Sequence, residues 1–227
     1  MTADAAVLSL PDGRGLELGR LSHEHAGTGG VVWPCSRALC RWMGNNVHDL
    51  RGARVLELGA GTGVCGIYAA ALGASRVLLT DDDRPALLSL ARSNVSLNAG
   101  LYAEGADIQV QALVWGQRAA MGVDQFDVVL GSDLTHLNRG CWLLCETLTM
   151  LLTVADHRRP GKRPPRVVLA HQDRQGEEGS RAQFLDIASQ NGLVVTELLV
   201  DRDPSDGYPP VPVAILEVTV PQYQLGS

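Results

Sequence analysis

The sequence predicts an α/β protein built on a doubly wound, mostly parallel sheet of seven strands that ends in an antiparallel hairpin. Short runs rich in Val, Leu and Ile alternate with stretches of helical periodicity, which is typical of consecutive βαβ units. The runs are apolar throughout, as expected for strands that are buried on both faces. The predicted strands cover residues 53–58, 76–80, 108–113, 126–130, 166–170, 193–200 and 211–220.

The first helical pattern precedes all of these strands, and the others lie between consecutive strands, except between 108–113 and 126–130 and between the last two. The predicted helices cover residues 34–47, 64–72, 84–97, 140–154 and 176–190. Residues 201–212 are rich in Pro, Asp and Gly and carry no helical pattern, so the last two strands should form the antiparallel hairpin. We expect a single domain over residues 1–227, with residues 1–30 as an N-terminal extension and residues 31–227 as the core.

Composition and charge exclude several classes of protein. A net charge of −6 argues against nucleic-acid binding by bulk electrostatics and is compatible with a basic partner. No apolar run approaches the ~20 residues of a membrane span, and no basic segment followed by an apolar run opens the chain. Five cysteines without a framework spacing suit a reducing compartment. We therefore expect a cytoplasmic protein, with the nucleus as a second location.

The most informative segment is residues 55–64, where an apolar strand runs into three alternating glycines and a helix. Such a turn lies at the carboxyl ends of the strands, where doubly wound sheets bind ligands. The segment lacks the Gly-Lys-Ser/Thr of a phosphate-binding loop, and Val64 stands where a dinucleotide site needs Gly or Ala. Glu57 just before the loop would repel a pyrophosphate but suits a cationic ligand. Asp81, at the end of the next strand, suits ribose hydroxyls.

Taken in order, the motifs of this chain resemble the class I S-adenosylmethionine-dependent methyltransferases, and within them methyltransferase family 16, which are mostly protein-lysine methyltransferases. The resemblance is carried by Val-Val-Trp-Pro at residues 31–34, the glycine loop at 55–64, Leu-Thr-Asp at 79–81, Leu-Val-Trp-Gly at 113–116 and Phe-Asp-Val-Val-Leu-Gly-Ser-Asp at 126–133. It implies the seven-stranded Rossmann-like fold, S-adenosylmethionine as cofactor, and methyl transfer to a lysine of a protein.

The resemblance also assigns roles to individual residues. Asp133 would face the methyl acceptor. As a hypothesis of mechanism, His136 or a water molecule would carry the proton away. This chain reads Asp-Leu-Thr-His at residues 133–136, where the family usually has Asp-x-x-Tyr. The residues that would contact or border the cofactor are Trp33, Glu57, Gly59, Ala60, Gly61, Asp81, Trp115 and Ser132.

Alternatives remain open at several of these positions. Asp82 or Asp83 stands beside Asp81 and offers the same carboxylate, and Glu57 is equally suited to accept backbone hydrogen bonds. Cys141 and Cys145 are four residues apart but lack further ligands, so no metal site is predicted.

Alternatives also remain open for the function. They are a catalytically silent cofactor-binding or partner-binding module, a protein-arginine methyltransferase and a small-molecule methyltransferase. The expected partner is a protein substrate, of basic or chaperone or translation type, and not a nucleic acid or a membrane.

Overall fold

A seven-stranded sheet forms the centre of the molecule, as the sequence predicts. The computed structural model describes residues 6–117, 126–135, 138–158, 164–172, 181–202 and 212–221. The strands lie in the order β5-β4-β3-β6-β7-β9-β8. All neighbours pair parallel except β7 with β9 and β8 with β9, which are antiparallel. The strands are β3 (Arg54–Leu58), β4 (Arg76–Asp81), β5 (Asp107–Ala112), β6 (Val128–Ser132), β7 (Arg166–Gln172), β8 (Val194–Asp201) and β9 (Val213–Thr219).

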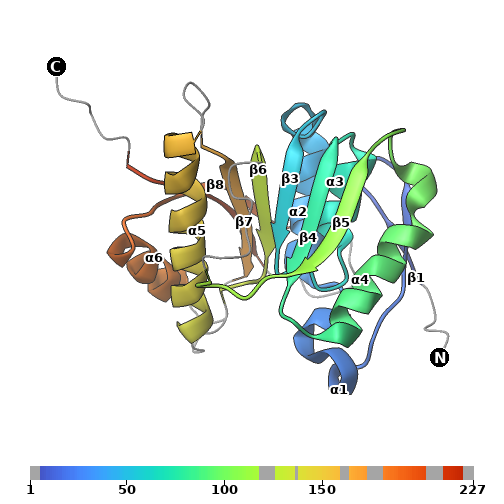
Figure 1. Ribbon diagram of the computed structural model, residues 1–227, viewed down its shortest axis with the longest axis horizontal. Coiled ribbons are helices and arrows are strands. Elements are labelled where there is room, and N and C mark those ends of the chain that lie inside the picture. The colour runs from blue at the N-terminus through green and yellow to red at the C-terminus, as the bar shows by residue number, and fades with distance from the viewer. Residues whose placement is uncertain are drawn as a thin grey trace.

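Helices cover both faces of this sheet (Figure 1). Side chains of α2 (Pro34–Asn45) and α3 (Val64–Ala71) form one buried cluster with the strands, and α4 (Pro85–Leu97) packs on the same side against β5. Side chains of α5 (Asn138–Arg158) and α6 (Arg181–Gln190) form a second buried cluster on the opposite face. Because both faces are covered, the central strands are apolar throughout, which explains why they appear as uninterrupted apolar runs.

Two strands end two residues later than the sequence indicates, and both differences matter for the site. β6 ends at Ser132 instead of residue 130, and β7 continues to Gln172 instead of ending at residue 170. The parallel register sets Ser132 opposite Ala170, so both strands reach the same edge of the sheet. The predicted helix at 176–190 is confirmed from Arg181 onward, and residues 173–180 lie outside the described ranges.

The N-terminal segment contains a hairpin that the sequence reading missed, formed by β1 (Ala6–Ser9) and β2 (Gly15–Leu18). Leu16 and Leu18 are fully buried in the same cluster as α2 and α3. The hairpin therefore packs into the core, although residues 1–30 were expected as an extension. Four short elements complete the part of the chain that the structure describes: α1 (His23–Ala26), η1 (Gly27–Gly30), η2 (Val47–Asp49) and η3 (Ala99–Leu101).

Two asparagines, Asn94 of α4 and Asn98 just after its last residue, attach this N-terminal segment to α4. Asn98 accepts a hydrogen bond from the Glu17 amide at 3.0 Å and donates to the Glu17 carbonyl at 2.8 Å. Asn94, one turn earlier and fully buried, makes the same pair of bonds with Gly19 and also donates to the Thr62 carbonyl in the glycine loop. Asn94 therefore joins the N-terminal segment and the glycine loop at one side chain. Within the ranges described, no helix is long and apolar enough to cross a membrane.

Candidate functional site

Most of the predicted site residues that the structure describes lie at the carboxyl edge of the sheet, where the strand order reverses. β3 lies between β4 and β6, so the chain leaves it toward one edge through β4 and β5 and returns to its other side at β6. In doubly wound sheets, ligands bind in the crevice at this reversal. The glycine loop follows β3, and residues 133–135 follow β6, which brings the two motifs to opposite sides of the place where the crevice is expected.

The glycine loop needs its glycines for conformation and for space. Gly59, Gly61 and Gly63 have φ of +57°, +55° and +83°, in the left-handed region that side chains disfavour. A Cβ at Gly61 would lie 2.8 Å from the carbonyl oxygen of Gly29, and one at Gly59 would overlap Leu134. The loop thus packs between the N-terminal segment and the segment after β6.

Asp81 holds the glycine loop against β4. Its Oδ2 accepts the Gly61 amide at 2.7 Å, its Oδ1 accepts the Asp82 amide at 2.8 Å, and Arg84 lies 3.7 Å from Oδ1. Burial raises the pKa of the carboxyl, while the two amide bonds lower it. A carboxylate accepts about four hydrogen bonds, so both oxygens keep room for ligand hydroxyls. Asp82 and Asp83, the alternatives, are both exposed.

Glu57 is buried beneath the loop, with 1% of its surface exposed. Its Oε2 accepts the Gly66 amide of α3 at 2.7 Å, a backbone bond of the kind that the sequence left open as an alternative. Burial raises the pKa of Glu57 to about 8, and the neighbouring carboxylate of Asp81 adds to this, while bonds from Gly66 and Cys65 oppose it. Whether Glu57 also contacts a cofactor stays a prediction.

The other predicted cofactor residues lie in the glycine loop, after β5 and at the start of α2. Ala60 is buried and its amide donates to the Thr80 carbonyl, which joins the loop to β4. Trp115 is half-buried, and its Cζ2 would lie 3.5 Å from a Cβ at Gly59. Trp33 is 37% exposed at the start of α2, where its indole N–H donates to the Thr28 carbonyl at 2.8 Å.

Ser132, at the end of β6, is tied to α2 by a residue that sequence reasoning missed. The hydroxyls of Ser132 and Ser36 are 2.9 Å apart, and Ser36 is buried in the first turn of α2. The Cys65 thiol donates to the Ser36 carbonyl from the start of α3. The end of β6 and the starts of α2 and α3 are therefore joined by one polar cluster.

Asp133 has an unusual backbone. Among the non-glycine residues that the structure describes, Asp133 alone has a positive φ, of +58°. Its amide donates to the Ala170 carbonyl at 2.9 Å, which fixes the turn after β6 to the end of β7. A strained backbone of this kind is common where a functional side chain must be held in place. His136, the second predicted catalytic residue, lies outside the described residues.

His171 is a buried neighbour of this turn that sequence reasoning did not find. Its Nδ1 lies 2.5 Å from the hydroxyl of Thr135, and both residues are 2% exposed. The only available signal was the sequence Ala-His-Gln at the end of a strand predicted to stop at residue 170. Because that strand is two residues longer, His171 belongs to it.

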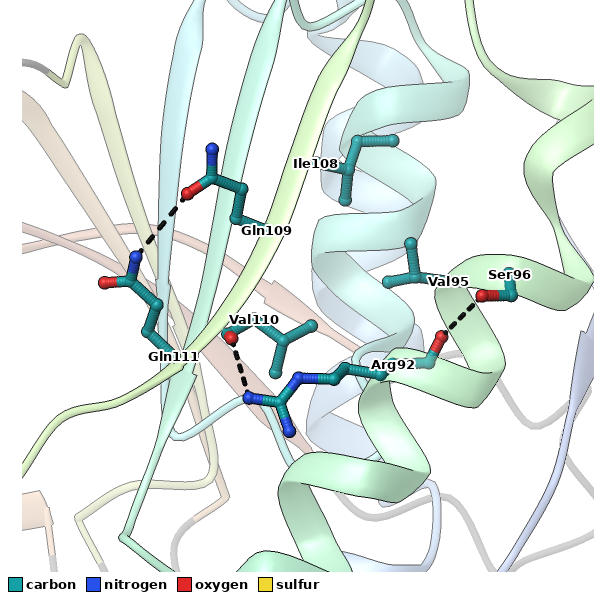
Figure 2. Close-up of a pocket in the computed structure, with 7 residues that line it drawn as sticks. All are labelled: Arg92, Val95, Ser96, Ile108, Gln109, Val110 and Gln111. Carbon is teal, nitrogen blue, oxygen red and sulfur yellow. Dashed lines mark hydrogen bonds between the residues drawn. The ribbon is translucent and has the colours of Figure 1, made fainter.

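A separate cleft lies at the outer edge of the sheet, between α4 and β5, and Figure 2 shows its lining. There the Arg92 guanidinium donates to the Val110 carbonyl at 3.1 Å and so covers part of the exposed strand edge. None of the predicted site residues lines this cleft. In the part of the chain that the structure describes, no three His, Cys, Asp or Glu side chains gather as metal ligands would.

Comparisons with known proteins agree with this arrangement. A family model described as lysine methyltransferase matches residues 14–190, most of the chain. Protein N-lysine methyltransferase METTL21A of Danio rerio is 36% identical over 145 residues, which are 63% of this chain and 62% of that protein. EEF1A lysine methyltransferase 3 of Xenopus tropicalis is 37% identical over 139 residues, 60% of this chain and 59% of that protein. The matches thus span about three fifths of these relatives.

A solved structure supports the fold alone, because the sequence identity is low. The magnesium protoporphyrin IX methyltransferase of Synechocystis, crystallised with bound SAH, has a TM-score of 0.56 at 15% identity and covers 89% of each chain.

Proposed function

Because this chain belongs to the lysine methyltransferase family, as its motifs predicted, we propose that it transfers a methyl group from S-adenosylmethionine to a lysine side chain of a protein. The observation that carries the proposal is the bond from the Gly61 amide to the Asp81 carboxylate, which closes the glycine loop around an acidic side chain. A loop of this kind suits a ligand that has ribose hydroxyls and a positive charge but no phosphate.

The residues of the crevice fit this cofactor. Gly59 and Gly61 leave the loop backbone open to close approach, and Asp81 keeps acceptor capacity for two ribose hydroxyls. The glycine loop contains three glycines and no lysine. When bound, the sulfonium supplies an already activated methyl group. The residues that would hold the cofactor are Trp33, Gly59, Ala60, Gly61, Asp81, Trp115 and Ser132.

We assign Glu57 an indirect role toward the cofactor. Its carboxyl binds the Gly66 amide and so holds the start of α3, which follows the glycine loop directly. A positive charge bound in the crevice would favour the ionised form of this carboxyl, whose pKa burial raises to about 8.

On the acceptor side, Asp133 is proposed to orient the attacking amine and to stabilise the positive charge that develops on its nitrogen. A lysine amine has a pKa of about 10.4 in water, so it must lose its proton before it attacks. Removal from water at the crevice lowers that pKa. His136 is proposed as the group that accepts the proton. Alignment of donor and acceptor can contribute several kcal/mol to the rate.

The substrate class is a proposal that rests on charge and on the relatives' names. A net charge of −6 favours a basic partner, and one relative is named for its action on EEF1A. We therefore propose a basic protein substrate of the translation or chaperone type, in the cytoplasm or the nucleus.

The decisive experiment is methyl transfer from tritiated S-adenosylmethionine into cytoplasmic and nuclear extracts, followed by amino-acid analysis of labelled bands. Methyllysine in a discrete band is the expected result. Methylarginine would instead assign the arginine alternative, and label confined to small molecules would assign the small-molecule alternative. Binding of S-adenosylhomocysteine without any label would identify a silent module. Purified elongation factor 1A serves as the first defined acceptor.

A further inference from the structure

The turn after β6 is attached to its surroundings at three successive residues. The Asp133 amide donates to the Ala170 carbonyl of β7 at 2.9 Å. The Leu134 side chain fills the space that the missing side chains of Gly59 and Gly131 leave open. Thr135 is joined to His171 through their side chains, at 2.5 Å. The first two attachments use backbone and packing, and the third depends on the chemistry of one imidazole.

The third attachment is the one that a single substitution would remove most readily. Thr135 and His171 are both 2% exposed, so water does not replace either partner when the other is lost. The Thr135 carbonyl also accepts the Cys141 thiol at 3.1 Å, which ties the turn to the first turns of α5. Thr135 is thus held on both its side chain and its backbone, two residues after the strained Asp133.

We infer that His171 is a positioning residue for methyl transfer, which fixes the Asp133 turn at the acceptor side of the crevice through its hydrogen bond to Thr135. This inference rests on the proposed function. His171 acts through Thr135 and the backbone, so its removal should change the rate of transfer and leave the cofactor side intact. Asp81 and the glycine loop, which hold the cofactor in the proposal, are attached to β4 and α3 instead.

Two substitutions at position 171 separate a hydrogen-bonding role from a packing role. Asparagine places an amide group where the imidazole has Nδ1, so His171→Asn keeps a partner for Thr135. His171→Leu fills the space but leaves the Thr135 hydroxyl without that partner. Thr135→Val removes the same bond from the other side. Thr149→Val is the matched control, because it also removes a threonine hydrogen bond, in this case to the Asn191 carbonyl. Thr149 lies about 16 Å along α5 from the first residue of that helix and therefore away from the turn.

The test measures transfer from tritiated S-adenosylmethionine into whole-cell extract, with titration of the extract to saturation. His171→Leu and Thr135→Val should each lower the maximal rate about tenfold or more, and their combination should lower it no further than the worse single variant. His171→Asn should stay within about threefold of the wild type. Affinity for S-adenosylhomocysteine, by calorimetry, should change less than about twofold in all variants, and Thr149→Val should keep the wild-type rate.

Hydrogen exchange gives a readout that does not depend on activity. Exchange at the amides of residues 131–135 should accelerate in His171→Leu and Thr135→Val and remain slow in His171→Asn and Thr149→Val. If His171→Leu fails to fold, the transfer rate and the hydrogen exchange are both measured on Thr135→Val.

Several results would overturn the inference. They are an unchanged maximal rate in the leucine and valine variants, equal losses in the leucine and asparagine variants, or losses that add in the double variant. A wild-type protein that binds S-adenosylhomocysteine but labels nothing would overturn the proposed function first, and the inference with it.

Discussion

The two sides of the crevice are held together in different ways. On the glycine-loop side, side-chain carboxylates accept hydrogen bonds from backbone amides that are near in the sequence. Glu57 accepts from the Gly66 amide, and Asp81 accepts from the Gly61 amide. On the β6–β7 side, a side-chain pair joins Thr135 to His171, 36 positions apart. On the first side the donors are backbone amides, which a residue of any type except proline supplies. The second depends on which residue a distant strand places at its end.

This difference predicts that the two sides fail differently when they are altered. Damage to the glycine-loop side should appear in cofactor affinity and stability, because that side forms the loop itself. Damage to the β6–β7 side should appear in the rate of transfer, because that side faces the acceptor in the proposed mechanism. Substitutions on each side can therefore sharpen or break the distinction.

The largest effect is expected from Asp133→Asn, on the β6–β7 side. Asparagine tolerates the φ of +58° that this position requires, so the backbone should persist while the carboxylate is lost. Methyl incorporation should fall about 100-fold or more, with affinity for S-adenosylhomocysteine changed less than about twofold. Labelling rates and calorimetry measure the two quantities. A matching loss of cofactor affinity would place Asp133 on the cofactor side.

The next effect concerns stability on the glycine-loop side, through Gly61→Ala. The new Cβ would lie 2.8 Å from the Gly29 carbonyl oxygen, at a φ of +55°. Gly52→Ala is the matched control, since Gly52 has a φ of +74° with open space around it. We expect the control to lose about 1 kcal/mol of unfolding free energy and Gly61→Ala about 3 kcal/mol. Urea denaturation compares the two variants. Equal losses of unfolding free energy would show that the Gly29 backbone moves aside without destabilising the protein.

Asp81→Ala tests the cofactor side more directly. The change removes a charged acceptor for ribose hydroxyls and frees the amides of Gly61 and Asp82. Affinity for S-adenosylhomocysteine should fall about 10-fold to 100-fold, which corresponds to about 1.5–3 kcal/mol. Calorimetry measures it, with Asp83→Ala as the control from the exposed neighbouring carboxylate. Undiminished affinity in Asp81→Ala would refute the ribose assignment.

A further effect on the glycine-loop side is a dependence of stability on pH that arises from Glu57. Its pKa is about 8 in the folded protein, against 4.5 for a free side chain, so the folded state keeps a proton that the unfolded state releases. Between these values the free energy of unfolding should fall as pH rises, by up to about 1.4 kcal/mol per pH unit. Below pH 4.5 this contribution is fully present.

Glu57→Gln should remove that slope and keep the bond to Gly66, since an amide oxygen also accepts the backbone N–H. Urea denaturation of both proteins at pH 5, 6, 7 and 8 gives the difference. Parallel curves for wild type and variant would show that Glu57 keeps its charge when folded.

The sequence by itself determined the fold class and the glycine-loop side. Apolar runs that alternate with helical patterns predicted the sheet, and three alternating glycines followed by Asp81 predicted the loop, because both signals depend on neighbouring residues. The N-terminal hairpin escaped prediction because its strands are only four residues each, and Leu16 and Leu18 are buried by contacts with helices far along the chain.

Only the tertiary structure decided how the β6–β7 side is built. The pairing of β6 with β7 places His171 beside Thr135, and the packing of α2 places Ser36 beside Ser132, 96 positions away. No local periodicity encodes such contacts, because they arise when strands and helices that are distant in sequence reach the same edge of the sheet. A short motif therefore locates Asp133, whereas the residues that hold it in place become visible only in the folded chain.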